Sequence, residues 1–258
     1  MEMLHSKVVG AGTPLLILHG YFGMGDNWKT HALALSKIGF EVHMIDQRNH
    51  GRSFHSDVFD YEVLVEDLLH YITAKGLSKC CVLGHSMGGK TAMLFATQYP
   101  ELVEKLVVVD IGPKEYPPHH NEILAALNAV DFSVDSSRKL VDERLSVLIP
   151  EVGVRQFLMR SVYWREKGVL DFRFNVKGLT ENNREVGRAL PAFEVYEGAT
   201  LFVAGERSSY IQREDYPLIQ AHFPAAIVKT VSKAGHWLHA ENPQEFYEIV
   251  SEFLTESK

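Results

Sequence analysis

The segment from residue 80 to residue 96 constrains the fold more than any other part of the chain. An apolar run that ends at Leu83 enters a turn containing Gly84, Ser86 and Gly88, and the residues after the turn have helical spacing. A strand that reverses directly into a helix brings two backbones together, so small residues are needed on both sides of Ser86. The pattern predicts a strained turn that exposes the Ser86 hydroxyl at the carboxyl end of a strand, near the positive end of the next helix.

Short apolar runs alternate with helical patterns on both sides of this turn. The runs are largely apolar, which is typical of strands in a parallel sheet that is covered on both faces. The expected strands cover residues 14–18, 41–45, 79–83, 105–109, 200–204 and 226–230. The expected helices between them cover residues 28–36, 60–76, 87–99, 215–222 and 243–254. The sequence therefore predicts an α/β fold with a mostly parallel central sheet and helices on both faces.

This alternation is interrupted between residues 113 and 191. Pro113, Pro117 and Pro118 mark the break, and no strong buried strand follows them. Helical patterns instead cover residues 121–129, 136–148 and 152–161. We therefore expect residues 113–191 to form a helical cap that is inserted into a core domain made of residues 1–112 and 192–258.

Composition limits the partners and the location of the chain. The net charge of −7 argues against a nucleic-acid surface, and no apolar stretch is long enough to span a membrane. The first residues lack the basic and apolar regions of a signal peptide. The only cysteines, Cys80 and Cys81, are neighbours in an expected strand and cannot readily bridge each other. These features predict a cytoplasmic protein in a reducing environment.

Metal ligands are not recognisable in the sequence. His119 and His120 are adjacent in a proline-rich turn, so they lack the i, i+4 spacing of paired ligands on a helix. We expect no metal ion and no cofactor. For the assembly, we expect a monomer or a weak homodimer.

Ser86 could act as a nucleophile if a histidine takes its proton and a carboxylate orients that histidine. His236 follows the last expected strand, on a loop before the closing helix, so it can approach Ser86 at the same edge of the sheet. The alternative for this motif is a glycine-rich turn in which Ser86 only caps a helix. We favour Ser86 as the nucleophile and His236 as the base.

The acid has several candidates. Asp110 ends the apolar strand before the expected cap, and burying a carboxylate there is costly unless it has a partner. Asp110 could instead cap the following turn, and Glu206 and Asp215 are alternative acids. We favour Asp110, with Ser208 close enough to share hydrogen bonds around the histidine–aspartate pair.

An oxyanion needs two backbone N–H groups directed at one point. Met87, the residue after the expected nucleophile, supplies one of them. The other should come from the glycine-containing loop after His19, most simply from Tyr21, with Phe22 as the alternative.

Aromatic residues near the expected mouth could line an apolar acyl pocket, although such residues are as often part of the core. The candidate substrate-binding residues are Phe22, His85, Trp164, Ser208, Tyr210 and Trp237.

Taken together, these motifs resemble the α/β-hydrolase superfamily over nearly the whole chain. Within it, the sequence is most similar to the YbfF-type bacterial esterases. The shared stretches are Asp46-x-Arg48-Asn49-His50-Gly51, His85-Ser86-Met87-Gly88-Gly89-Lys90, Arg173-Phe174-Asn175-Val176 and Ala234-Gly235-His236-Trp237-Leu238-His239-Ala240-Glu241. The resemblance implies a Ser–His–Asp triad with the acid before the cap, at Asp110, and with Ser208 where other members carry aspartate. It also implies hydrolysis of carboxylic esters, including short acyl esters and acyl-CoA thioesters.

Other functions on the same fold remain open. A carbon–carbon bond hydrolase or lyase could use the same three residues, and its substrates would call for arginines in the cap, of which the chain has Arg155, Arg160, Arg165 and Arg173. Ser86 argues against haloalkane dehalogenases and epoxide hydrolases, which need aspartate at that position. A non-catalytic binding module would normally have lost a triad residue. We therefore expect a serine esterase that hydrolyses short to medium acyl esters, and acyl-CoA thioesters as a further substrate class.

Overall fold

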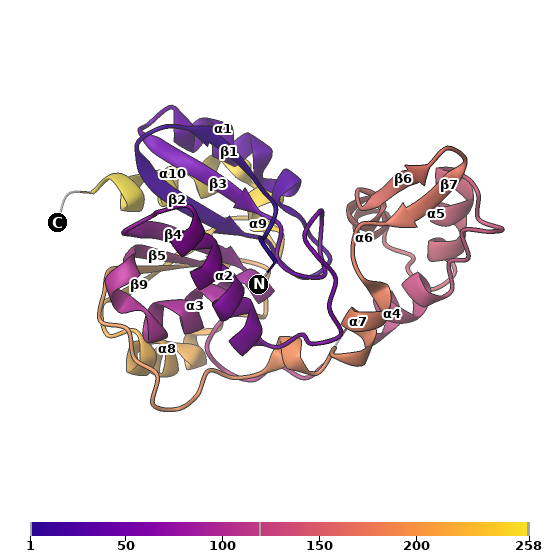
Figure 1. The fold of residues 1–258 in the computed structure, drawn as a ribbon. Helices are drawn as coiled ribbons and strands as arrows, with labels where there is room; N and C mark the ends of the chain where they lie inside the picture. The colour runs from indigo at the N-terminus through magenta and orange to yellow at the C-terminus, as the bar shows by residue number, and fades with distance from the viewer. Residues whose placement is uncertain (1, 119, 257–258) are drawn as a thin grey trace.

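The computed structural model describes residues 2–118 and 120–256, so His119, one of the two adjacent histidines considered above, lies outside the described residues. A seven-stranded sheet within these residues has the strand order β1-β3-β2-β4-β5-β8-β9 (Figure 1). Its strands are β1 (Ser6–Gly10), β2 (Thr13–Leu18), β3 (Phe40–Ile45), β4 (Cys80–His85), β5 (Val103–Val109), β8 (Thr200–Gly205) and β9 (Ala226–Val231). All neighbouring strands are parallel except β1, which runs antiparallel to β3. The mostly parallel α/β sheet that the sequence predicts is thus confirmed.

Helices cover both faces of the sheet because each strand directs alternate side chains to opposite faces. On one face, α1 (Lys29–Ser36), α9 (Leu238–Glu241) and α10 (Pro243–Thr255) pack over the sheet in one apolar cluster. On the other face lie α2 (Tyr61–Ala74), α3 (Met87–Gln98) and α8 (Tyr216–His222). Short 3-10 turns are η1 (Gly25–Trp28), η2 (Pro100–Leu102), η3 (Glu185–Gly187) and η4 (Arg213–Asp215). None of the helices within the described ranges combines the length and the apolar character needed to cross a bilayer.

The chain between β5 and β8 forms a separate arm beside the sheet (Figure 1). We call residues 113–191 the inserted segment. Its elements are α4 (Asn121–Asn128), α5 (Arg138–Ser146), α6 (Val152–Met159), β6 (Val162–Glu166), β7 (Val169–Phe172) and α7 (Val176–Glu181). The antiparallel hairpin β6–β7 is an addition to the purely helical segment that the sequence predicts. The first and last residues of the segment lie side by side, because Leu190 N donates to Pro113 O at 2.9 Å and Tyr116 N donates to Gly187 O at 2.8 Å.

Candidate active site

Ser86 occupies the sharp turn between β4 and α3. Its φ of 53° lies in the left-handed region that residues other than glycine rarely adopt. A Cβ atom at Gly84 would lie 2.1 Å from Gly88 O, and one at Gly88 would lie 2.3 Å from Leu18 O. Neither glycine could carry a side chain unless the backbone moved. Because Ser86 N also donates to Val109 O at 3.0 Å, the turn holds the serine against the end of β5.

Asp110 follows β5 and is fully buried. Its Oδ2 accepts hydrogen bonds from His236 Nδ1 at 2.8 Å and from Ser208 Oγ at 2.5 Å, and its Oδ1 accepts one from Gly205 N at 3.0 Å. These three donors offset the cost of burying the carboxylate. Because a carboxylate can only accept, Nδ1 of His236 carries the proton, and Nε2 is left to act as a base.

The two alternative acids have other partners. Glu206 Oε2 accepts the Lys233 N–H at 2.6 Å, and Asp215 Oδ2 forms an ion pair with Lys114 Nζ at 2.7 Å. Among the hydrogen bonds and ion pairs of the described residues, none joins either carboxylate to His236. The geometry therefore favours Asp110 over both.

His236 is held on its ring and on its backbone. The ring stacks on Tyr210, with centroids 3.9 Å apart and planes 16° apart. The His236 carbonyl oxygen accepts a hydrogen bond from His85 Nε2 at 2.9 Å. Burial, together with nearby His236 and His239, lowers the pKa of His85 well below its usual value, so His85 is neutral and carries its proton on Nε2. His85 thus fixes the loop that presents His236.

The loop after β2 carries the expected oxyanion donors. Phe22 N donates to His50 Nε2 at 3.2 Å, so this amide is already engaged. Among the hydrogen bonds of residues 2–118 and 120–256, none uses the Tyr21 N–H. Met87 is the first residue of α3, where a helix leaves its N–H groups without an intrahelical partner. The geometry therefore favours Tyr21 over Phe22 as the partner of Met87.

Two buried imidazoles hold that loop in place. His50 Nδ1 donates to Arg48 O at 2.9 Å, which leaves Nε2 to accept the amide above. His19 Nδ1 donates to Gly20 O at 2.8 Å, and its Nε2 accepts the Gln47 N–H at 3.0 Å. Burial lowers the pKa of both histidines, and for His50 the shift is large. Both rings are therefore neutral, and each uses one nitrogen as a donor and the other as an acceptor.

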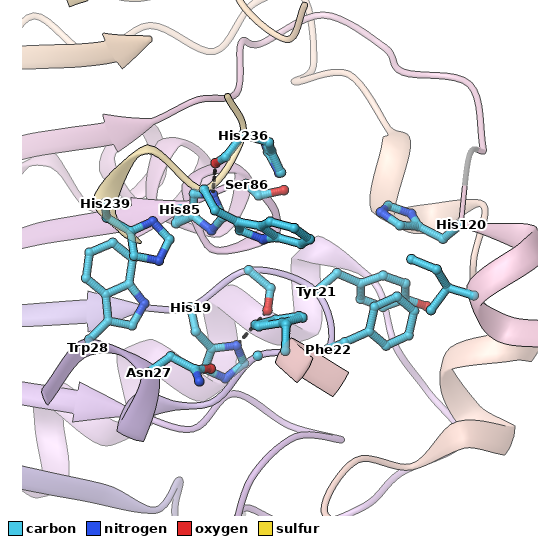
Figure 2. A pocket seen from close by; sticks show the side chains of 15 residues that line it. His19, Tyr21, Phe22, Asn27, Trp28, His85, Ser86, His120, His236 and His239 are labelled. Atoms are coloured by element: carbon cyan, nitrogen blue, oxygen red, sulfur yellow. Dashed lines mark hydrogen bonds between the residues drawn. The ribbon is translucent and has the colours of Figure 1, made fainter. Parts of the chain in front are cut away.

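A cavity of about 70 Å³ opens beside Ser86. Figure 2 shows Ser86 and His236 at its wall, with Trp28 and His239 at one end and Tyr21, Phe22 and His120 toward the other. The inserted segment closes one side, because Phe157 packs on Trp237 with ring centroids 5.4 Å apart.

The candidate substrate-binding residues separate into three groups. Phe22, His85 and Trp237 line the first cavity, and Tyr210 lines a second cavity that also includes Ser86. Ser208 lines neither, because its hydroxyl is bonded to Asp110. Trp164 lines neither and is 55% exposed, because β6 carries it to the outer hairpin of the inserted segment.

Some lining residues carry no sequence signal. His120, Ile123, Phe157 and Asn183 reach the cavities from the inserted segment. They belong to no motif and share no spacing, so only the folding of that segment brings them to Ser86. A prediction of them would have required the tertiary path of the segment.

Comparisons with known proteins show the family to which this fold belongs. A family model described as alpha/beta hydrolase fold matches residues 13–147. The sn-1-specific diacylglycerol lipase ABHD11 of Danio rerio is 38% identical over 253 residues, covering 95% of this chain and 79% of the relative. Esterase YbfF of Escherichia coli is 32% identical over 247 residues, covering 95% and 94%. The solved structure of a marine microorganism esterase has a TM-score of 0.95 at 39% identity, covering 98% of this chain and 100% of that one.

Proposed function

This chain belongs to the α/β-hydrolase fold family, and on that basis we propose that Ser86, His236 and Asp110 form its catalytic triad. The chain is a serine ester hydrolase that acts on small-molecule carboxylic esters, in agreement with relatives that are named as esterases and lipases. The observation that carries the triad is the 2.8 Å hydrogen bond from His236 Nδ1 to buried Asp110, in a cavity that His236 shares with Ser86. This bond sets the tautomer in which Nε2 can take the serine proton.

The first step of the reaction forms an acyl-enzyme. Ser86 Oγ attacks the ester carbonyl carbon while His236 Nε2 takes the hydroxyl proton, and buried Asp110 stabilises the imidazolium. The N–H groups of Met87 and Tyr21 stabilise the negative charge on the carbonyl oxygen. The tetrahedral intermediate then collapses, the carbon–oxygen bond to the alcohol breaks, and His236 gives its proton to the leaving oxygen.

The second step releases the acid. A water molecule attacks the acyl carbon while His236 Nε2 takes one of its protons, and the same two N–H groups stabilise the new oxyanion. When the intermediate collapses, the proton returns to Ser86 Oγ and the carboxylic acid leaves. A thioester carbonyl undergoes the same two attacks, so short acyl-CoA thioesters belong to the proposal.

The inserted segment limits the size of the substrate. We assign residues 113–191 the role of a cap over a core made of residues 1–112 and 192–258, because Phe157 and His120 complete the wall of the cavity at Ser86. The cavity volume of about 70 Å³ favours esters with small groups. The zebrafish relative is named for diacylglycerol, which adds longer esters to the panel worth testing.

Removal of the nucleophile tests the proposal. Ser86→Ala should lower kcat for p-nitrophenyl butyrate by more than about 10³-fold while the protein stays folded by circular dichroism. A fluorophosphonate should label the wild type at Ser86 and leave the variant unlabelled. The matched control is Ser136→Ala, at an exposed serine of the inserted segment, which should keep full turnover and labelling. Substantial turnover by Ser86→Ala would refute the triad.

A further inference from the structure

A second cavity shares Ser86 with the first and extends under the entry and exit of the inserted segment. Met87 and Ile111 of the core line it, together with Tyr116, Val186 and Asn183 of the segment. The remaining space is about 10 Å³, which holds about one group of the size of water. Its walls are mostly apolar, so any polar atom that faces it stands out.

Asn183 lines this cavity and carries a polar atom that is unpaired within the described part of the chain. The side chain is 7% exposed, and its Nδ2 donates to Asn121 Oδ1 at 3.0 Å. The other amide atom, Oδ1, is buried and has no hydrogen-bond partner among residues 2–118 and 120–256. Asn183 lines both this cavity and an open groove on the outside of the segment, and Asn121 lines only the groove. Because Nδ2 is bonded to Asn121 and Oδ1 is buried, we take Oδ1 as the amide atom on the side of the inner cavity. A buried carbonyl oxygen without a partner can accept a hydrogen bond from a bound ligand.

Another polar group at the same wall is already satisfied. Tyr116 Oη donates to Tyr210 O at 2.6 Å and accepts the Gly112 N–H at 2.8 Å. The residues that line the cavity include no aspartate or glutamate, so an ammonium group there would have no carboxylate as its counter-charge. Ser86, His120 and Tyr210 also bring polar side chains to the cavity wall, and none of them is a carboxylate. A neutral hydroxyl is therefore a donor that fits these largely apolar walls and the buried amide oxygen.

The mechanism decides which half of the ester enters this cavity. The leaving alcohol oxygen must receive a proton from His236, and His236 lines the first cavity but not the second. Met87, which follows the nucleophile, lines the second cavity. The alcohol half therefore occupies the first cavity, and the end of a short acyl chain reaches the second.

We propose that Asn183 is a specificity-determining residue whose Oδ1 accepts a hydrogen bond from a hydroxyl on the acyl chain, so that the preferred substrates are esters of short hydroxy acids. The inference rests on the proposed esterase function and names the substrate class for the same site. A site that pairs with a hydroxyl discriminates against an isostere that lacks one, because the site is then left with an unpaired acceptor.

Isosteric ester pairs test this with the wild type alone. The p-nitrophenyl esters of both enantiomers of lactate and 3-hydroxybutyrate are compared with those of isobutyrate and 3-methylbutyrate, in which a methyl group replaces the hydroxyl. At least one hydroxyacyl ester should show a kcat/KM about tenfold above its isostere. Equal values throughout all pairs would overturn the proposal, whatever the behaviour of any variant.

A variant assigns the preference to one residue. Asn183→Leu keeps the branched shape of the side chain and removes the acceptor, so it should abolish the preference and raise kcat/KM for the alkyl isostere. The matched control is Asn128→Leu, at an exposed asparagine of the outer groove, which should keep the preference. A preference that survives in Asn183→Leu would overturn the assignment.

A third comparison places the hydroxyl on the alcohol half, with 2-hydroxypropyl butyrate against isobutyl butyrate. Neither the wild type nor Asn183→Leu should discriminate between these two butyrate esters. An Asn183-dependent preference here would overturn the placement of the acyl chain. If the esterase proposal were wrong, no ester would show Ser86-dependent hydrolysis. If only the role of Asn183 were wrong, Ser86-dependent hydrolysis would remain but would show no preference for a hydroxyl.

Discussion

Ser208 Oγ lies 2.5 Å from Asp110 Oδ2, the same carboxylate oxygen that accepts the His236 Nδ1–H at 2.8 Å. Ser208 also stands where the resemblance to α/β-hydrolases leads one to expect the acid itself. The serine hydroxyl therefore holds the proposed acid, which comes from the end of β5, before the inserted segment. Since Ser208 lines neither cavity at Ser86, its effect on the reaction passes through Asp110.

Ser208→Ala should lower kcat about tenfold and leave KM unchanged, because it removes one hydrogen bond to a charged acceptor and touches no substrate. Ser208→Thr keeps the hydroxyl and should recover most of the rate. Steady-state kinetics on p-nitrophenyl butyrate measure both. A rise in KM at constant kcat would show instead that Ser208 binds substrate.

Asp110→Asn should lower kcat by about 10³–10⁴-fold, because the asparagine amide no longer favours the tautomer with the proton on Nδ1 of His236. Glu206→Gln is the matched control, since Glu206 bonds the Lys233 amide and not the histidine. This variant should stay within about twofold of the wild type. If only Glu206→Gln lowered kcat by this amount, the assignment of the acid would be wrong.

The sequence predicted those parts of the fold whose residues have strong local requirements. Gly84 and Gly88 occupy positions in the turn that admit no Cβ. Six largely apolar runs became β2, β3, β4, β5, β8 and β9, with ends within two residues. Strand β1 was missed because it is an edge strand with half-exposed, partly polar residues.

Prediction was weaker in the inserted segment. The hairpin β6–β7 is short and largely exposed, so it has no continuous apolar run. The same exposure explains why Trp164, proposed from its residue type, lies at the outer hairpin and away from both cavities. Asn183 could not be singled out, because its significance comes from burial at a cavity that Ser86 also lines and from an unpaired oxygen, neither of which a sequence displays.

The hydrogen bond from Phe22 N to His50 Nε2 predicts a positioning role for a residue outside the triad. His50→Leu should lower kcat about tenfold and destabilise the fold by about 1–3 kcal/mol. The Phe22 amide loses its acceptor, and the loop after β2, which carries the proposed oxyanion donor Tyr21, is held less firmly. His55→Leu, at an exposed histidine of the same loop region, is the control. Kinetics and urea unfolding measure the two effects. An unchanged kcat in a destabilised His50→Leu would restrict His50 to a structural role.

Lys90 makes the stability of the protein depend on pH. It lies on α3, is 1% exposed, and donates from Nζ to Lys114 O at 2.5 Å. Burial lowers its pKa from 10.5 to about 7. The unfolded chain therefore binds more protons than the folded chain between about pH 7 and pH 10.5, so the free energy of unfolding rises with pH across this window.

Between pH 7 and pH 9, this rise should amount to about 2 kcal/mol, and it should be missing in Lys90→Met. Below about pH 6 both states are largely protonated, so there Lys90→Met should be more stable than the wild type by a nearly constant amount. Lys79→Met, at an exposed lysine, should keep the wild-type slope. Urea unfolding of the three proteins at pH 6, 7.5 and 9 measures the difference. A wild-type slope in Lys90→Met would mean that Lys90 keeps its proton in the folded protein, where its bond to Lys114 O and its contact with the Tyr116 ring would then offset the cost of the buried charge.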